Sequence, residues 1–302
     1  MARGPRARTA PDGLVVVDKP AGMTSHDVVS RMRRIAGTRK VGHAGTLDPM
    51  ATGVLLIGVE RATRLLGLLA LTDKAYEATI RLGRATVTDD AEGEETSRAD
   101  TSAITDAEII AGVVPLTGVI EQRPSAVSAI KVGGVRSYAR VRAGEDVELP
   151  PRTVTVSRFD ILGSRRSLDA DGRGFLDVDV SVTCGSGTYI RALARDLGAA
   201  LGVGGHLTAL RRTRVGPFGL GSAHPLEELE QNFSLLPLGD VLTASYPRLD
   251  VDAVTAMSVL HGHRVVTAEP YVGPVGIFGP QGEVLSLAEL REGALVPLVV
   301  FS

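Results

Sequence analysis

The sequence predicts an α+β protein of two domains, and three observations support this prediction. Its 302 residues are enough for about two domains of ordinary size. Helical and strand patterns alternate from residue 13 to about residue 243. From Tyr246 onward, short valine-rich pieces are separated by Gly and Pro, which is typical of a small β-rich domain. We therefore expect a disordered basic arm over 1–12, a larger domain over 13–243 and a smaller one over 244–302.

A strand and a helix are the first predicted elements. The apolar run 14–17 predicts a strand that ends at Asp18-Lys19-Pro20. Ser25 is the predicted N-cap of the helix that follows. The apolar residues of this helix recur at helical spacing: Val28, Val29, Met32, Ile35 and Ala36. Its other face carries Arg31, Arg33 and Arg34.

The middle of the chain alternates between apolar segments and polar loops. The pattern predicts a strand over 53–59, an apolar helix over 62–71 and an alternating strand over 76–82. The acidic segment 86–100 has no periodicity, so we expect a solvated loop. Residues 122–150 are rich in Gly, Pro, Arg and Ser, and their number indicates a functional loop or insertion.

A strand and a helix are also predicted over residues 176–201. Leu176, Val178, Val180 and Val182 alternate with polar residues, which predicts a half-buried strand running into Cys184. Thr188 is the predicted N-cap of a helix with an apolar inner face.

Composition limits the class of protein. With 44% hydrophobic and 23% charged residues, the chain is an ordinary globular protein, and we expect it in the cytoplasm. Charged residues interrupt the best apolar run, and no secretory signal is visible, so we expect no membrane association. Cys184 is the sole cysteine, which excludes an internal disulfide. We expect neither a metal nor a cofactor, because no multi-cysteine or HExxH pattern occurs.

The net charge of −2 conceals an uneven distribution. Residues 1–40 carry a balance of +6, residues 121–158 of +3 and residues 191–214 of +4, whereas residues 86–110 carry −7. Three basic stretches would favour nucleic-acid binding if they converged in space.

Arg191 and Asp48 raise a question of charge compensation. Arg191 falls in the first turn of its predicted helix, where the macrodipole disfavours a cation by a few tenths of a kcal/mol. It is either exposed or paired with a distant carboxylate. Asp48 is a candidate partner because small residues surround it, although an Asp-Pro turn is the simpler reading of its local sequence. Pairing would keep a half-buried Asp ionised and able to act as a nucleophile or base.

Five separated motifs resemble the TruB family of tRNA pseudouridine synthases. The matching segments, in order and at the family's spacing, are VVVDKPAGMTS (15–25) with GHAGTLDPMATGVL (42–55), KAY (74–76), PSAVSAIKVGGVRSY (124–138), CGSGTYIR (184–191) and GHLTALRR (205–212). The resemblance covers about residues 13–220. It implies the pseudouridine synthase fold, an α+β arrangement with a mixed, largely antiparallel sheet and a central catalytic cleft, followed by a small PUA-like C-terminal domain.

The resemblance also implies an activity and its catalytic residues. Family members convert uridine 55 of the tRNA T-arm to pseudouridine by flipping the base, breaking the glycosidic bond and rejoining the base through C5. Asp48 matches the essential aspartate, Tyr76 the active-site tyrosine and Arg191 the arginine that pairs with the aspartate. The sequence leaves open whether Asp48 attacks the ribose, adds to the base or removes the C2′ proton.

Further matches concern the RNA. His43 matches the residue that fills the place of the flipped nucleotide. Beside the base, the matching residues are Lys19, Pro20, Tyr189 and Leu210. In the segment that matches the family's RNA-binding thumb insertion (122–150), the expected phosphate contacts are Arg123, Lys131, Arg136, Arg140 and Arg142. From residue 269 on, the chain has four acids and one arginine, which argues against a large part for the C-terminal domain in gripping RNA.

The expected partner is therefore the T-arm of tRNA, and we expect a monomer without an obligate protein partner. Two other functions are compatible with parts of the sequence. An RNA chaperone would use the same flipping step to help tRNA refold. A glycoside hydrolase would need two carboxylates about 5–10 Å apart. Asp89 and Asp90 could supply the second carboxylate, but we expect them in a solvated loop.

Overall fold

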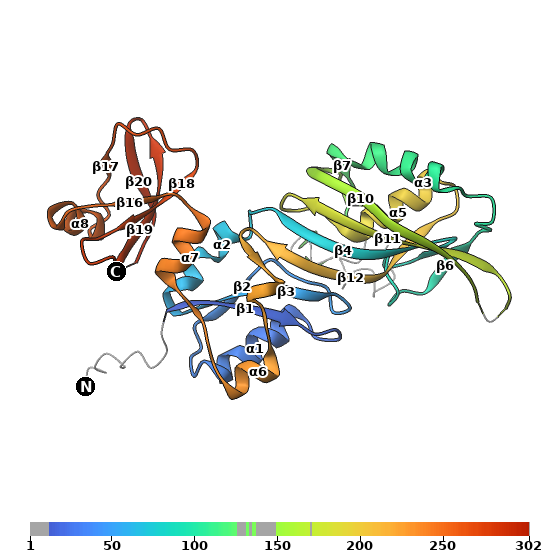
Figure 1. Cartoon of the computed structure of the whole chain (residues 1–302), viewed down its shortest axis with the longest axis horizontal. Helices are drawn as coiled ribbons and strands as arrows, with labels where there is room; N and C mark the ends of the chain where they lie inside the picture. Colours follow the sequence, from blue (N-terminus) through green and yellow to red (C-terminus); the bar gives the residue numbers. More distant parts are fainter. Residues whose placement is uncertain (1–11, 126–130, 133–134, 137–148, 170, 302) are drawn as a thin grey trace. The chain divides into compact units, whose positions relative to one another are not determined.

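The computed structural model describes residues 12–125, 131–132, 135–136, 149–169 and 171–301, and the chain forms two compact units (Figure 1). The first unit comprises Met1–Pro49, Gly53–Ala70 and Gly216–Ser302, and the second Met50–Thr52 and Leu71–Val215. In the described ranges, no helix has the length and apolarity that a membrane crossing requires. The predicted domain boundaries stay predictions.

The first unit is built on the buried strand β3 (Thr52–Val59). It pairs antiparallel with β1 (Gly13–Lys19) and with β2 (Val41–Ala44). Two short strands extend the sheet on β1: β14 (His224–Pro225) is parallel to it and β15 (Leu236–Pro237) is antiparallel. The predicted strands at 14–17 and 53–59 are confirmed.

Helix α1 (Ser25–Ile35) lies where the sequence predicts a helix, but its N-cap is Thr24. The Thr24 hydroxyl accepts from the Asp27 N–H, and the Asp27 carboxylate accepts from the Thr24 N–H, which is a complete capping box. The prediction of Ser25 as the cap is wrong. The predicted helix over 62–71 is instead a 3₁₀ helix, η1 (Glu60–Leu65), followed by one turn of α helix, α2 (Leu66–Leu69).

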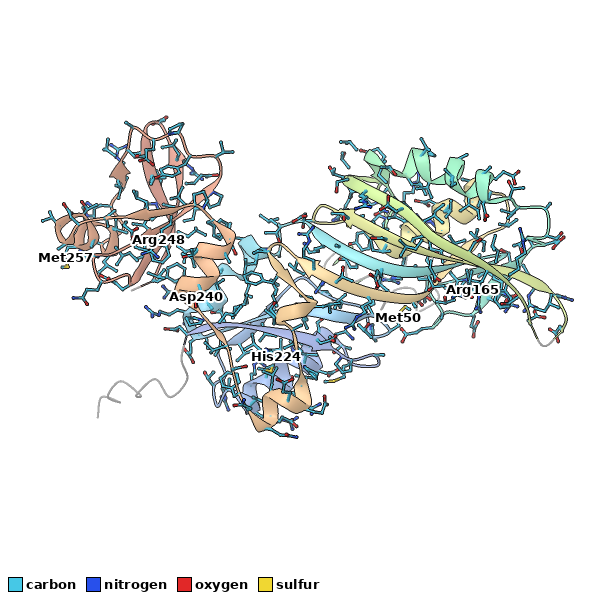
Figure 2. All side chains as sticks on the ribbon, in the orientation of Figure 1. Met50, Arg165, His224, Asp240, Arg248 and Met257 are labelled. Atoms are coloured by element: carbon cyan, nitrogen blue, oxygen red, sulfur yellow. The ribbon has the colours of Figure 1, made fainter. Side chains whose placement is uncertain are left out.

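Helices α6 (Leu226–Gln231) and α7 (Leu238–Ser245) precede a five-stranded sheet. This sheet contains β16 (Arg248–Asp250), β17 (Val265–Val266), β18 (Pro274–Phe278), β19 (Val284–Arg291) and β20 (Ala294–Val300), in the order β16-β18-β19-β20-β17. Helix α8 (Ala253–Leu260) contributes Val259 to its apolar core. The guanidinium of Arg248 lies 4.0 Å from the ring centroid of Phe278 (Figure 2). The prediction of a small β-rich C-terminal domain is confirmed.

The end of β20 is attached to η1 by two arginines. Arg61 Nη1 donates to the carbonyl of Phe301 at 2.7 Å, and Arg64 donates to the carbonyl of Val300. Arg61 also forms an ion pair with Asp12. Phe301 itself is buried. The last described residues are therefore part of the packed structure of the first unit.

The second unit contains an antiparallel sheet in the order β12-β4-β11-β10-β7. Its strands are β4 (Lys74–Leu82), β7 (Gly118–Gln122), β10 (Arg152–Leu168), β11 (Gly174–Cys184) and β12 (Gly205–Val215). Helices α3 (Asp106–Val113) and α5 (Ile190–Ala200) pack together against this sheet (Figure 1). A Cβ on Gly198 of α5 would lie 2.2 Å from the backbone of Gly204, so helix and strand meet without an intervening side chain.

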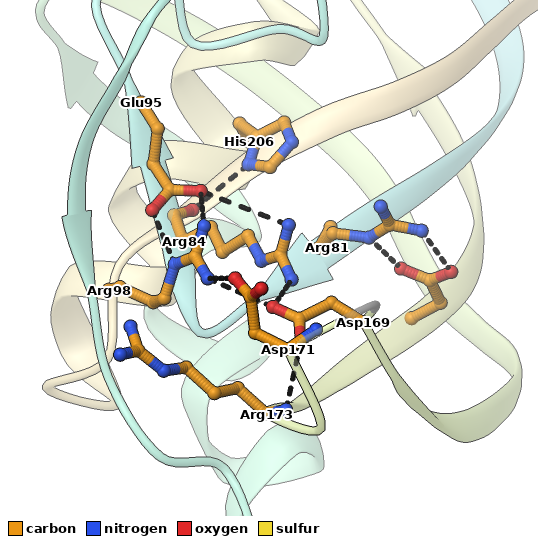
Figure 3. A network of polar contacts seen from close by, with 9 residues as sticks. Arg81, Arg84, Glu95, Arg98, Asp169, Asp171, Arg173 and His206 are labelled. Atoms are coloured by element: carbon orange, nitrogen blue, oxygen red, sulfur yellow. Dashed lines mark hydrogen bonds and ion pairs between the residues drawn. The ribbon is translucent and has the colours of Figure 1, made fainter.

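The sequence predicts a solvated loop for the acidic segment 86–100, but only residues 91–100 are mostly exposed. The segment belongs to a ribbon of β5 (Arg84–Thr86) and β6 (Glu95–Arg98), and both Asp89 and Asp90 are buried in the loop between them. Figure 3 shows how Asp169, in the turn between β10 and β11, fastens this ribbon. Its carboxylate accepts from Arg84 at 2.7 Å and from Arg98 at 2.9 Å.

Candidate active site

The predicted site residues occur in both units, and each set is described by itself. In the first unit, Asp48 lies in the loop between β2 and β3, and Ser25 fixes the residue before it. The Ser25 hydroxyl donates to the Leu47 carbonyl at 3.1 Å and accepts from the Leu47 N–H at 2.8 Å. Ser25 is thus an anchor for the Asp48 loop, because Thr24 has already capped the helix.

Lys19 fixes the residue after Asp48. This lysine is fully buried, and its ammonium donates to the carbonyls of Pro20 at 2.9 Å, Met23 at 2.6 Å and Pro49 at 3.1 Å. The Pro49 carbonyl also accepts from the Gly22 N–H at 2.8 Å. A buried ammonium is stable only where oxygens replace its water, and these carbonyls do so. Lys19 and Pro20 therefore shape the Asp48 loop, as their position in the motif suggested.

His43 lies on β2, opposite Ile57 of β3, and is half-buried. It precedes Asp48 on the same strand-to-loop segment. Its predicted entry into the RNA stack stays a prediction.

In the second unit, Tyr76 and Leu210 lie on one face of the sheet. Leu210 is directly opposite Ala78, which is on the same face as Tyr76 because alternate residues of a strand share a face. Arg212 is opposite Tyr76 and is almost completely buried. Burial, together with the nearby Arg212 charge, lowers the pKa of Lys74. Tyr76 therefore has buried cations beside it, which suits the carbonyl oxygens of a nucleobase or a phosphate.

Arg191 is in the first turn of α5, as predicted, and it is buried. Its Nη1 donates to the Thr88 carbonyl at 2.9 Å and lies 3.4 Å from the Asp90 carboxylate. Asp90 thus offsets the unfavourable position of this cation at a helix N-terminus. The predicted pairing of Arg191 with Asp48 stays a prediction.

The backbone of the N-cap residue of α5 is held by a side chain from β7. Tyr189 is the N-cap, so the prediction of Thr188 is wrong, and the Thr188 hydroxyl instead donates to Gly185. Gln122, at the end of β7, donates its amide to the Tyr189 carbonyl at 3.0 Å and accepts from the Tyr189 N–H at 2.8 Å. The insertion that starts at Gln122 is therefore tied to the helix of Arg191.

A hollow of about 620 Å³ in the second unit adjoins Leu210. Its lining also includes Met50 and Thr52, which follow Asp48 closely in the chain, together with Glu77 and Arg211. Arg211 Nη1 donates to the Thr52 hydroxyl at 3.2 Å. The hollow is large enough for a nucleobase.

The predicted phosphate contacts are only partly described. Arg140 and Arg142 lie outside the described residues. Lys131 is on β8 (Lys131–Val132) and pairs directly with Arg136 of β9 (Val135–Arg136). Arg123 is exposed.

One predicted basic face is partly neutralised. Arg31 of α1 binds Glu230 at 2.7 Å and Glu227 at 3.0 Å, both of α6. This arginine is therefore engaged within the protein, which the charge count of residues 1–40 did not reveal.

The sequence predicts no part for Asp90, Gln122 or Arg212 in a pseudouridine synthase site. Asp90 was counted with a run of acids, and its partner is about 100 residues away in the chain. Arg212 could have been found from the sequence, because it belongs to the GHLTALRR motif. In the structure it is paired with Tyr76 across β12 and β4. In the described part of the chain, no cluster of His, Cys, Asp and Glu has the arrangement of a metal site.

Comparisons with known proteins identify the family. Residues 33–190 match the model of the TruB family pseudouridylate synthase N-terminal domain. Residues 191–237 match the tRNA pseudouridylate synthase B C-terminal domain, and residues 246–302 match the tRNA pseudouridine synthase II C-terminal domain.

Curated relatives align over nearly the whole chain. The tRNA pseudouridine synthase B of Thermobifida fusca is 60% identical, covering 96% of this chain and 99% of that protein. The protein of the same name from Streptomyces griseus is 58% identical, covering 97% of this chain and 98% of that protein.

Solved structures agree with this family assignment. An H/ACA RNP bound to a substrate RNA containing 2′-deoxyuridine has a matching chain with a TM-score of 0.69 and 26% identity, covering 96% of this chain and 85% of that chain. A Cbf5-Nop10-Gar1 complex matches with a TM-score of 0.68 and 27% identity, covering 96% of this chain and 84% of that chain. The expected pseudouridine synthase fold, with its mixed and largely antiparallel sheet, is confirmed. The chain belongs to the TruB family of pseudouridylate synthases.

Proposed function

We propose that this protein converts uridine 55 in the T-arm of tRNA to pseudouridine. The observation that carries the proposal is the placement of Asp48, the family's essential aspartate, between two residues whose backbones are fixed by Ser25 and Lys19. The names of the curated relatives support tRNA as the substrate.

The reaction rearranges one nucleoside. The C1′–N1 bond breaks, the uracil rotates, and a C1′–C5 bond forms while C5 loses its proton and N1 gains one. A carboxylate at Asp48 can add to the ribose, add to the base or remove the C2′ proton, and each route requires it to be ionised. In this proposal Arg191, which matches the family's arginine, pairs with Asp48 and keeps it ionised.

The target base must leave the folded T-loop before it can react. Unstacking costs a few kcal/mol, and His43 is the side chain that we assign to the vacated place. Tyr76 and Leu210, on one face of the sheet, supply an aromatic and an aliphatic surface for the flipped uracil. Arg123, Lys131, Arg136, Arg140 and Arg142 bind phosphates in this proposal, so binding weakens steeply with added salt.

The decisive test is Asp48→Asn. We expect the rate of pseudouridine formation in a T-arm stem-loop RNA to fall at least about 10³-fold, because an amide cannot act as nucleophile or base. Asp171→Asn, an acid in an exposed turn, is the matched control and should keep the wild-type rate. Mapping of pseudouridine in total tRNA, with and without the wild-type protein, identifies the position. Wild-type turnover by Asp48→Asn, or modification elsewhere than position 55, would refute the proposal.

We propose a tRNA-folding chaperone role as a secondary activity of the same RNA-binding surface. The Asp48→Asn protein separates the two activities, because it should still accelerate refolding of an unmodified tRNA. Failure to accelerate refolding would remove the secondary role and leave the enzymatic one intact. We also expect the protein to act in the cytoplasm. We expect it to be a monomer, and sedimentation of the purified chain would check this oligomeric state.

A further inference from the structure

A second cluster of buried polar groups lies next to Arg191 and has no part in the chemistry proposed above. Asp89 is 7% exposed, and its carboxylate accepts from the hydroxyl of Ser125 at 2.6 Å and from Arg195 Nη1 at 3.2 Å. Ser125 is fully buried. Arg195 Nη2 in turn donates to the carbonyl of Arg123 at 2.7 Å. The cluster thus joins α5, the loop between β5 and β6, and the first residues of the basic insertion.

The geometry of the loop directs its two acids to two arginines of one helix. Arg191 and Arg195 are four residues apart on α5 and therefore lie on the same face. Arg191 takes Asp90, and Arg195 takes Asp89. Both carboxylates of the loop therefore bind the same face of α5.

Asp89 holds an unusual backbone conformation to do this. Its φ is +58°, in the left-handed region, which is unfavourable for a residue with a side chain. Two backbone hydrogen bonds keep it there: its N–H donates to Thr86 and its carbonyl accepts from the Leu207 N–H at 3.0 Å. Burial also raises the pKa of Asp89, so the donors Ser125 and Arg195 are needed to keep the carboxylate charged.

The root of the insertion is held at three successive points. Gln122 binds the backbone of Tyr189, the Arg123 carbonyl binds Arg195, and Ser125 binds Asp89. Each attachment leads to α5 or to the loop that α5 holds. Residues 122–125 are therefore placed by the same helix that carries Arg191.

We infer that Asp89, Ser125 and Arg195 are positioning residues that fix the root of the RNA-binding insertion against α5. They set the affinity for the T-arm and leave the chemical step to other residues. The inference rests on the proposed function, in which the insertion binds the RNA backbone.

The test separates binding from chemistry. The variants are Ser125→Ala, Asp89→Asn and the double variant, and Ser164→Ala is the matched control because it removes an exposed Ser-to-Asp hydrogen bond, 2.9 Å to Asp106, in the same unit. Affinity is measured with a T-arm stem-loop whose target uridine is replaced by cytidine. The rate is measured in a single turnover at saturating uridine-containing RNA, and thermal unfolding verifies that each variant is folded.

We expect Ser125→Ala to bind the RNA about tenfold more weakly, with a saturating rate within about twofold of wild type. The double variant should bind no more weakly than Asp89→Asn alone, since Ser125 acts in this cluster through its hydrogen bond to Asp89. Ser164→Ala should bind like wild type. Wild-type affinity in Ser125→Ala, a fall in the saturating rate alone, or additive effects would overturn the inference. A wild-type protein that does not modify the T-arm at all would instead refute the proposed function.

Discussion

The loop around Asp48 and the loop around Asp90 both place carboxylates beside buried strands, but they are fixed in different ways. Ser25 and Lys19 hold the Asp48 loop through the backbones of Leu47 and Pro49. The loop between β5 and β6 is held through its carboxylates, which bind Arg191 and Arg195. The first loop is therefore anchored through its main chain. The second loop is anchored through its side chains, whose charges orient the arginines of α5.

The largest expected effect comes from breaking the backbone anchor at Lys19. Lys19→Met keeps the length of the side chain but leaves the carbonyls of Pro20, Met23 and Pro49 without their ammonium donor. We expect the free energy of unfolding, measured by urea denaturation, to fall by about 4 kcal/mol. Lys40→Met, at an exposed position in the same unit, should change it by less than about 0.5 kcal/mol. A loss under 1 kcal/mol in Lys19→Met would show that the ammonium does not fix the loop.

A somewhat smaller effect should follow from displacing α5, the helix whose arginines bind the loop between β5 and β6. Gly198→Ala places a Cβ against the backbone of Gly204, so α5 must move away from β12. We expect a loss of about 3 kcal/mol in unfolding free energy, together with slower catalysis because Arg191 moves with the helix. Gly163→Ala is the control, since its added Cβ meets nothing within 4 Å. Equal stability of the two variants would contradict the close packing of α5.

Ser25→Ala tests the other anchor of the Asp48 loop. It removes both hydrogen bonds to Leu47 in a buried place, which should lower the unfolding free energy by about 2 kcal/mol and lower kcat. Ser30→Ala removes an exposed hydroxyl from the same helix and should be nearly neutral. If both variants have wild-type kcat, the placement of Asp48 does not depend on this anchor.

The smallest effect concerns pH. His206 Nδ1 lies 2.9 Å from the carbonyl of Arg84, the first residue of β5. Burial lowers the pKa of this histidine. The charges of Arg81 and Arg84 act in the same direction, whereas the hydrogen bond to the Arg84 carbonyl and the charge of Asp177 raise the pKa. The folded state therefore binds fewer protons than the unfolded state, and stability is lost as the pH falls below about 6.5.

We expect His206→Asn, which retains a donor for Arg84, to lose less stability than wild type between pH 7 and pH 5 in denaturant titrations. His261, which bonds a backbone carbonyl on the exposed surface at 2.7 Å, provides the control His261→Asn. Parallel pH profiles for wild type and His206→Asn would show that the buried ring does not titrate with unfolding.

The sequence predicted the parts of this comparison that depend on local pattern. The strands at β1, β3, β4 and β11 follow from apolar runs and alternation, and the motif around Asp48 follows from resemblance. The local sequence could not decide whether Thr24 or Ser25 caps α1, because both carry a hydroxyl group. The structure shows that Thr24 is the cap and that Ser25 instead binds Leu47. That contact joins residues 22 positions apart.

The loop between β5 and β6 was misjudged for a similar reason. A run of acids without periodicity is normally solvated, and only the arginines of α5, about 100 residues later, reverse that expectation. The β10 strand and the contact of Gln122 with Tyr189 also depend on distant partners. The resemblance therefore singled out Asp48, but the sequence did not predict the residues that fix its loop or the loop between β5 and β6.

The grip of Arg61 and Arg64 on the carbonyls of Phe301 and Val300 has a consequence for biosynthesis. Residues 60–64 leave the ribosome long before residues 300 and 301 are made, so Arg61 and Arg64 lack these two carbonyl acceptors during most of that interval. Until Phe301 is made, the place that it fills beside η1 is open to solvent.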